Sequence, residues 1–141
     1  MPKVYVAEPP AAYRARPALV VDCSALAVVM FREPGADQVA TQLAGHQLHA
    51  PYLLQAELAN VALVKHRRGE PHALAALAHA AELAIELHGL DRVAVATLAE
   101  QFGLTAYDAA YLCLSVELAC PLITLDRKLG AAAQRLFGGG R

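Results

Sequence analysis

Short apolar runs of strand length alternate along this chain with longer segments whose apolar residues recur at helical spacing. The runs at residues 19–22 and 121–126 are the clearest strands, because each is rich in leucine and β-branched residues and ends in an aspartate. Strands that alternate with helices favour a parallel sheet covered on both faces. The sequence therefore predicts a three-layer α/β/α domain with a mostly parallel central sheet.

Glycine and proline breaks set the expected order of elements. Strands are expected at residues 19–22, 47–50, 92–96 and 121–126. Helices are expected at residues 25–31, 36–44, 51–66, 72–87, 97–102, 105–118 and 127–136. Ser24 is expected to cap the first of these helices. Leu74, Leu77, Ala81 and Ile85 stand at helical spacing, which is the reason for extending one helix over residues 72–87.

The length of 141 residues suits one domain with short flanking segments. Residues 1–18 contain several prolines and are expected to form an irregular N-terminal arm. Residues 19–137 are expected to form the folded domain. Residues 138–141 are glycine-rich and are expected to be disordered.

Composition excludes several classes of protein. Apolar residues make up 57% of the chain and charged residues 18%, so the chain can bury a core and is not expected to be intrinsically disordered. Charged and polar residues interrupt the two most apolar stretches, residues 18–31 and 73–87, which argues against a membrane span. The net charge of −1 provides no overall basic field for nucleic acid. Three cysteines and the absence of an apolar leader suit a cytoplasmic protein.

Four acidic residues stand where elements begin or end. Asp22 and Asp126 end the two clearest strands, and ligands of such sheets bind beyond the carboxyl ends of the strands. Glu57 lies in the second turn of a helix, and Asp108 follows Thr105 at the start of another. All four side chains are therefore candidates for one crevice.

Each acid also has a purely structural explanation. Asp22 can accept hydrogen bonds from the turn that follows it, and Asp126 can cap the last helix. Asp108 and Thr105 fit a capping pattern at the start of a helix. Glu57 can be an ordinary helix-surface residue. Taken singly, the structural and functional explanations are about equally good.

Carboxylates that gather in one place repel one another unless cations or protons intervene. Oxygen ligands without histidine or cysteine favour Mg²⁺, with Mn²⁺ as the alternative. Such ions activate water and stabilise charge on a phosphate during phosphoryl chemistry. The residue types alone thus indicate metal-assisted chemistry at phosphate.

Four segments resemble, in order and spacing, the motifs of the PIN-domain ribonucleases, and particularly the VapC-like toxins of bacterial toxin–antitoxin pairs. They are residues 20–26 (VVDCSAL), 55–61 (QAELANV), 104–111 (LTAYDAAY) and 121–129 (PLITLDRKL). The resemblance covers about residues 19–136.

This resemblance implies a function and a site. Asp22, Glu57, Asp108 and Asp126 would be both the catalytic residues and the metal ligands, with Ser24 and Thr124 in support. The implied activity is Mg²⁺-dependent endonucleolytic cleavage of RNA, with a 5′-phosphate and a 3′-hydroxyl as products. An antitoxin protein would bind the chain, and the resemblance also suggests a homodimer.

Other side chains are weaker candidates. Arg127 and Lys128 follow Asp126 and are placed to contact a substrate phosphate, although surface cations are common there. Tyr111 shares a helix face with Asp108 and either lines the site or packs in the core. Cys23 follows Asp22, but no histidine accompanies it in a motif, so a small buried residue is the better interpretation.

The basic cluster at residues 65–68 could contact RNA, although a solvated helix end explains it better. The six histidines form no ligand-spaced pair and are interpreted as surface or interface residues.

Two other functions remain open from the sequence. One is an aspartate-dependent phosphatase or phosphoacceptor domain with Asp22 as nucleophile, although Asp22 lacks a second aspartate two residues on. The other is a non-catalytic module of the same fold that binds RNA or protein without cleaving it.

Overall fold

The computed structural model describes residues 1–7 and 15–138. Its four strands are β1 (Ala18–Val21), β2 (Gln47–Pro51), β3 (Ile85–His88) and β4 (Leu122–Ile123). Its helices are α1 (Cys23–Met30), α2 (Ala36–Leu43), α3 (Leu53–Arg67), α4 (Ala73–Ala80), α5 (Arg92–Phe102), α6 (Ala106–Leu118) and α7 (Arg127–Gly138).

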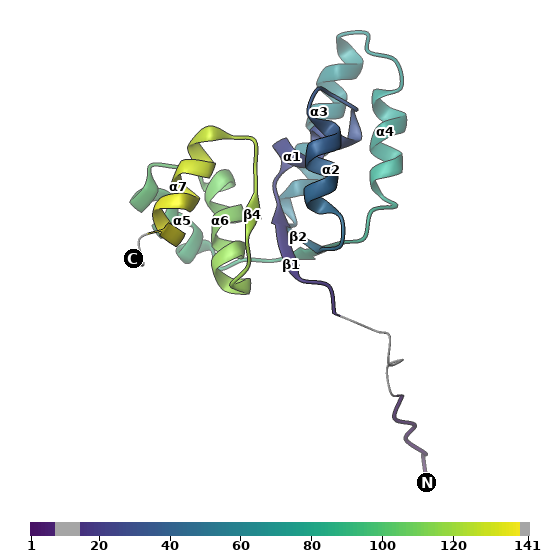
Figure 1. Ribbon diagram of the computed structural model, residues 1–141, viewed down its shortest axis with the longest axis vertical. Helices are drawn as coiled ribbons and strands as arrows, with labels where there is room; N and C mark the ends of the chain where they lie inside the picture. The colour runs from purple at the N-terminus through teal and green to yellow at the C-terminus, as the bar shows by residue number, and fades with distance from the viewer. Residues whose placement is uncertain (8–14, 139–141) are drawn as a thin grey trace.

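The strands form one parallel sheet in the order β3-β2-β1-β4. Helices α1 to α4 lie on one side of the sheet and α5 to α7 on the other (Figure 1). This arrangement confirms the predicted three-layer α/β/α fold. All the strand pairs of the described residues are parallel, so the carboxyl ends of β1 and β4 lie next to each other.

Helix α6 is the centre of the core. Seven consecutive residues of α6, from Ala109 to Ser115, are buried. The helix contacts β1, β2 and β4 on one side, and α5 and α7 on the other. Because every side of its middle turns is covered, α6 is apolar nearly all round, which is what a fully buried helix requires.

Two predicted elements are wrong. Residues 72–87 form α4 and then, after a turn, strand β3, instead of one helix. Ile85 and Leu87 pair with Leu48 and Ala50 of β2, so tertiary pairing outweighs the helical spacing that predicted one long helix. Residues 92–96 belong to α5 rather than a strand, because the Asp91 side chain caps this helix by accepting the Ala94 N–H at 2.8 Å.

Smaller differences concern the ends of elements. Asp22, not Ser24, is the N-cap of α1. Strand β4 spans two residues instead of the expected six. Residues 1–7 form no helix or strand, and residues 8–14 of the expected arm lie outside the described residues. Gly138 belongs to α7, and residues 139–141 of the expected tail also lie outside the described residues.

No helix within residues 1–7 and 15–138 combines the length and the apolar character that a membrane span requires.

Replacing a core residue of α6 tests this description. Leu114 is fully buried, so Leu114→Ala should lower the free energy of unfolding by about 2–5 kcal/mol in chemical denaturation. Leu74 is 47% exposed on α4, and the matched Leu74→Ala control should change the free energy of unfolding by no more than about 0.5 kcal/mol. Equal losses in the two variants would show that α6 is not the centre of the core.

Candidate active site

Parallel pairing of β1 with β4 brings two predicted site residues together. Val21 pairs with Ile123, and the Asp22 N–H donates to the Ile123 carbonyl at 3.2 Å. Asp22 follows β1 directly, and Asp126 follows β4 after a short turn. Two aspartates more than a hundred residues apart in the sequence therefore lie at one edge of the sheet.

Asp22 is buried, with 4% of its surface exposed, and three groups orient its carboxylate. The Ser24 hydroxyl lies 2.7 Å from Oδ1 and 2.9 Å from Oδ2. The Thr124 hydroxyl donates to Oδ2, and the Ala25 N–H donates to Oδ1 at 2.9 Å. Asp22 is therefore a helix cap and a rigidly held site residue at the same time.

Ser24 and Thr124 also connect Asp22 to the loop after β4. The Leu125 N–H donates to Ser24 Oγ at 2.9 Å, and the Asp126 N–H donates to Thr124 Oγ1 at 3.0 Å. Each hydroxyl thus donates to Asp22 and accepts from the loop backbone. Any change in either hydroxyl is expected to shift Asp22 and Asp126 together.

Asp126 caps α7, because its Oδ1 accepts the Leu129 N–H at 2.8 Å. The predicted cap and the predicted site position therefore occur together. A cap uses one carboxylate oxygen and leaves the residue's negative charge in place. Capping does not exclude Asp126 from a site.

Glu57 and Tyr111 form a pair across two helices. Glu57 lies in the second turn of α3 and is half-buried. The hydroxyl of Tyr111, from α6, donates to Glu57 Oε1. Tyr111 is itself buried, with 1% exposed, so it both packs in the core and positions Glu57.

The electrostatics connect all four acids. Burial raises the pKa of Asp22, and the charge of Asp126 raises it further, against lowering by the hydrogen bonds from Thr124, Ala25 and Ser24. Burial likewise raises the pKa of Glu57, and the charges of Asp108 and Asp22 add to the rise. The structure therefore brings the four carboxylates close enough to repel one another.

Asp108 lies in the first turn of α6, where the Thr105 hydroxyl accepts the Asp108 N–H at 3.1 Å. Burial and the charge of Asp126 raise the pKa of the Asp108 carboxyl, while Thr105 and Lys128 lower it. Lys128 therefore lies near enough to act on Asp108. Arg127 and Lys128 are both exposed beside this cluster.

Two other sequence candidates are not part of the cluster's chemistry. Burial and the nearby charges of Glu57 and Asp22 raise the pKa of Cys23 to about 12, so the thiol stays protonated at neutral pH. Lys65, in the basic cluster, binds Glu33 at 2.6 Å and Glu70 at 3.2 Å. Lys65 thus has carboxylate partners within the protein and serves the fold.

Sequence reasoning missed a second cluster. Among the described residues, His49, Glu86 and His88 are the one set of three possible metal-ligating side chains whose ligand atoms all lie within 4.8 Å of one another. The four acids are more widely spaced than this. The histidine cluster depends on the pairing of β2 with β3, and the sequence predicted β3 as part of a helix.

The family follows from this fold and from the sequence. The PIN domain family model matches residues 19–134. The chain therefore belongs to the PIN domain family, which confirms the resemblance found in the four motifs.

Named relatives point to one branch of that family. The chain is 34% identical over 119 residues to Ribonuclease VapC3 of Pyrobaculum aerophilum, covering 79% of this chain and 91% of that protein. The crystal structure of PAE2754 from Pyrobaculum aerophilum is similar in fold, with a TM-score of 0.67, 23% identity, and coverage of 87% and 96% of the two chains.

A second solved structure has the same fold. It is Mycobacterium tuberculosis VapC20, described as a sarcin-ricin loop cleaving toxin, with a TM-score of 0.59 and 15% identity. The match covers 81% of this chain and 94% of that one. At such low identities the two structures establish the fold alone.

The repulsion among the acids predicts how the melting temperature of the metal-free protein changes when one carboxylate is removed. The raised pKa of Asp108 means that its proton binds more tightly in the folded state than in the unfolded state. The stability this contributes is present below the unfolded pKa of about 3.8 and is lost as the pH rises through the folded value. With a chelator at neutral pH, Asp108→Asn should therefore melt at a higher temperature than wild type, and the difference should shrink towards pH 4.

Asp108 suits this test better than Asp22, because an amide at Asp22 would disturb the three donors around it, whereas the Thr105 cap uses the backbone N–H of Asp108. Asp91→Asn is the control, since Asp91 caps α5 and does not belong to the acidic cluster. If Asp108→Asn melts at or below the wild-type temperature throughout this pH range, repulsion is not a significant cost at this position.

Proposed function

We propose that this protein is a divalent-metal-dependent endoribonuclease whose catalytic residues are Asp22, Glu57, Asp108 and Asp126. The observation that carries the proposal is the mutual repulsion of these carboxylates at the carboxyl edge of a parallel sheet, with Asp22 held by several donors. Kinship with a protein named as a ribonuclease supports RNA as the substrate.

The four acids suit Mg²⁺, with Mn²⁺ as the alternative. All their donor atoms are carboxylate oxygens, and the raised pKa values of Asp22, Glu57 and Asp108 indicate that nearby positive charge would relieve the cluster. When bound, such an ion would supply a water of lowered pKa and would neutralise charge on the phosphate.

The chain's own residues then have separate roles. Ser24 and Thr124 keep the Asp22 oxygens in a fixed orientation. Tyr111 does the same for Glu57 from the core. Arg127 and Lys128 are proposed to bind RNA phosphates beside the acids. They would supply local positive charge in a protein whose net charge is −1. The expected products carry a 5′-phosphate and a 3′-hydroxyl.

The structure weakens the phosphoacceptor alternative. Both oxygens of Asp22 accept hydrogen bonds, and the residue is nearly inaccessible. A nucleophilic carboxylate has to reach the phosphorus atom of a whole phosphate group, which the burial of Asp22 opposes. The acids are therefore better suited to holding charge than to forming a covalent bond.

We further propose that the chain is the toxin of a cytoplasmic toxin–antitoxin pair, and that it forms a homodimer. Similarity to a VapC protein supports this assignment. An apolar groove between α3, α4 and β3 offers a surface for a partner segment; it is lined by Leu54, Leu58, Leu77, Leu83 and Ile85.

Single substitutions test the catalytic assignment. Asp22→Asn and Asp126→Asn should each lower Mg²⁺-dependent RNA cleavage by orders of magnitude, because the amide keeps the shape and loses the charge. Cleavage is measured with purified protein on a labelled RNA, and near-ultraviolet circular dichroism checks the fold. The products should carry 5′-phosphates.

Cys23→Ala and Asp91→Asn are the controls and should cleave close to the wild-type rate. Asp91 is matched to Asp22, since both are aspartates that cap helices. Unchanged cleavage by Asp22→Asn would refute the site, whereas wild type that binds RNA without cleaving it would support the non-catalytic module. A phosphoaspartate trapped at Asp22 would instead restore the phosphoacceptor function.

Co-expression tests the partner. The product of the neighbouring reading frame should co-purify with this chain and suppress its cleavage of RNA, and the chain alone should elute as a dimer. Leu77→Asp and Leu83→Asp, which put charge into the apolar groove, should weaken that complex. A monomer that is inert towards the neighbouring product would count against the toxin assignment.

A further inference from the structure

The histidine cluster is built by two neighbouring strands. His49 of β2 is the register partner of Glu86 of β3, and Pro51 is the partner of His88. Side chains two residues apart in a strand point to the same face, so Glu86 and His88 share the face that carries His49. The cluster therefore belongs to the β2–β3 pair and not to the edge where the four acids meet.

The ligand atoms of the three side chains converge. His49 Nδ1 lies 2.9 Å from His88 Nε2. Glu86 places Oε2 3.7 Å from His49 Nδ1, and Oε1 3.8 Å from His88 Nε2. Two nitrogens on one tetrahedral zinc ion, each at about 2.0–2.1 Å, lie about 3.3 Å apart. The spacing of the three groups is therefore close to that of ligands around a single ion.

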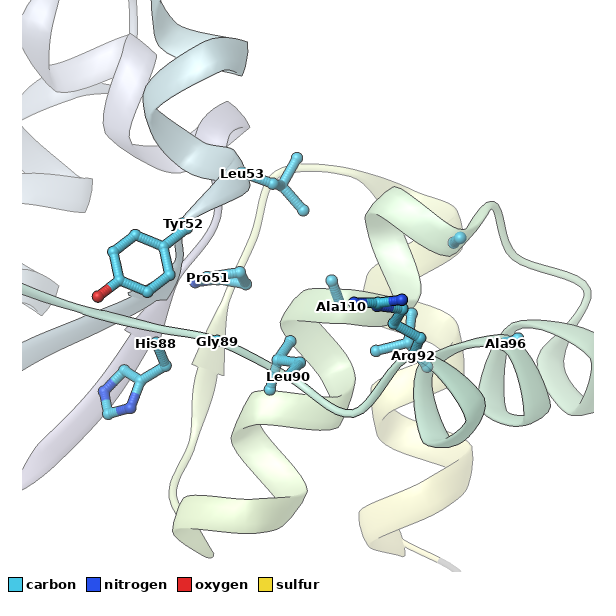
Figure 2. A pocket seen from close by; sticks show the side chains of 11 residues that line it. Pro51, Tyr52, Leu53, His88, Gly89, Leu90, Arg92, Ala96 and Ala110 are labelled. Carbon is cyan, nitrogen blue, oxygen red and sulfur yellow. The ribbon is translucent and has the colours of Figure 1, made fainter.

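Burial is graded across the cluster. The side chain of His49 is 10% exposed, that of His88 is 22% exposed and that of Glu86 is 60% exposed. His88 also lines a pocket together with Pro51, Tyr52, Leu90 and Arg92, and Figure 2 shows its imidazole at the end of this pocket away from Arg92. An ion at the cluster would have protein on one side and solvent on the other.

We infer that His49, Glu86 and His88 form a second metal site, for Zn²⁺ or a similar transition-metal ion. Two imidazoles and one carboxylate are a typical zinc ligand set, and solvent access leaves a fourth position for water. This donor set differs from the all-carboxylate cluster, which favours Mg²⁺. The inference does not depend on the proposed ribonuclease activity.

The position of the site gives the ion a structural effect. Strand β3 has four residues and lies at the edge of the sheet, where, within residues 1–7 and 15–138, it pairs with β2 alone. An ion shared by His49 and the two β3 residues would join these strands through their side chains. Because it binds the folded protein and not the separated strands, the ion would stabilise the fold.

Zinc titration of the full chain tests the inference. The protein carries no affinity tag, is stripped with chelator, and is titrated with Zn²⁺ while millimolar Mg²⁺ is present to compete for the four acids. Wild type should bind one equivalent, measured by competition with a chromophoric chelator, and its melting temperature should rise. Co²⁺ in place of Zn²⁺ should give the visible absorption of a nitrogen-ligated ion.

The variants separate the two clusters. His88→Ala should abolish this binding and the rise in melting temperature, and Glu86→Gln should weaken binding by at least about tenfold. His66→Ala and Glu100→Gln replace exposed residues outside both clusters and should bind like wild type. Asp126→Asn should also keep the zinc site, because it changes only the acidic cluster.

Unchanged zinc affinity in both His88→Ala and Glu86→Gln would overturn the inference. Loss of binding in Asp126→Asn with retention in His88→Ala would overturn it as well, by placing the ion among the acids. If His88→Ala does not fold, Glu86→Gln decides, since the Glu86 side chain is mostly exposed and its replacement leaves the core intact.

Discussion

The parallel pairing of β1 with β4 is the contact on which the site depends. It places the loop after β4 beside Asp22, so that Ser24 and Thr124 can donate to the Asp22 carboxylate while accepting backbone N–H groups of that loop. Although β4 has only two residues, these hydrogen bonds fix the position of the loop that follows it. Without this pairing, Asp22 would keep its local donors Ser24 and Ala25 but would lose the Thr124 hydroxyl and a fixed position relative to Asp126.

The same arrangement has an energetic cost. Burial and mutual repulsion raise the pKa values of Asp22, Glu57 and Asp108, so the folded protein holds negative charge in an unfavourable place. The hydroxyls of Ser24, Thr124 and Tyr111 offset part of that cost. A cation would offset more, so the proposed metal binding would also stabilise the fold.

The sheet carries two groups of possible metal ligands with different chemistry. The acids at the β1–β4 end present oxygen atoms, whereas the β2–β3 pair presents two imidazoles and one carboxylate. Ions that prefer hard oxygen ligands and ions that prefer nitrogen are therefore separated by ligand type. The two groups are also built differently, because the first joins loops and helix starts, while the second joins adjacent strands.

Much of this could be predicted from the sequence because the relevant signals are local. The apolar runs that end in Asp22 and Asp126, the Thr105 cap and the ordered motifs identify the layered fold, the four acids and the family. Strand β3 could not be predicted, since whether Ile85 lies in a helix or a strand is decided by pairing with β2. The Asp91 cap of α5, by contrast, is a local signal that the strand prediction for residues 92–96 overlooked. The histidine cluster could not be predicted either, because it forms only when β3 pairs with β2. Local chemistry determines helix caps and strand ends, but contacts between distant segments depend on the register in which the strands pair, and only the tertiary structure decides that.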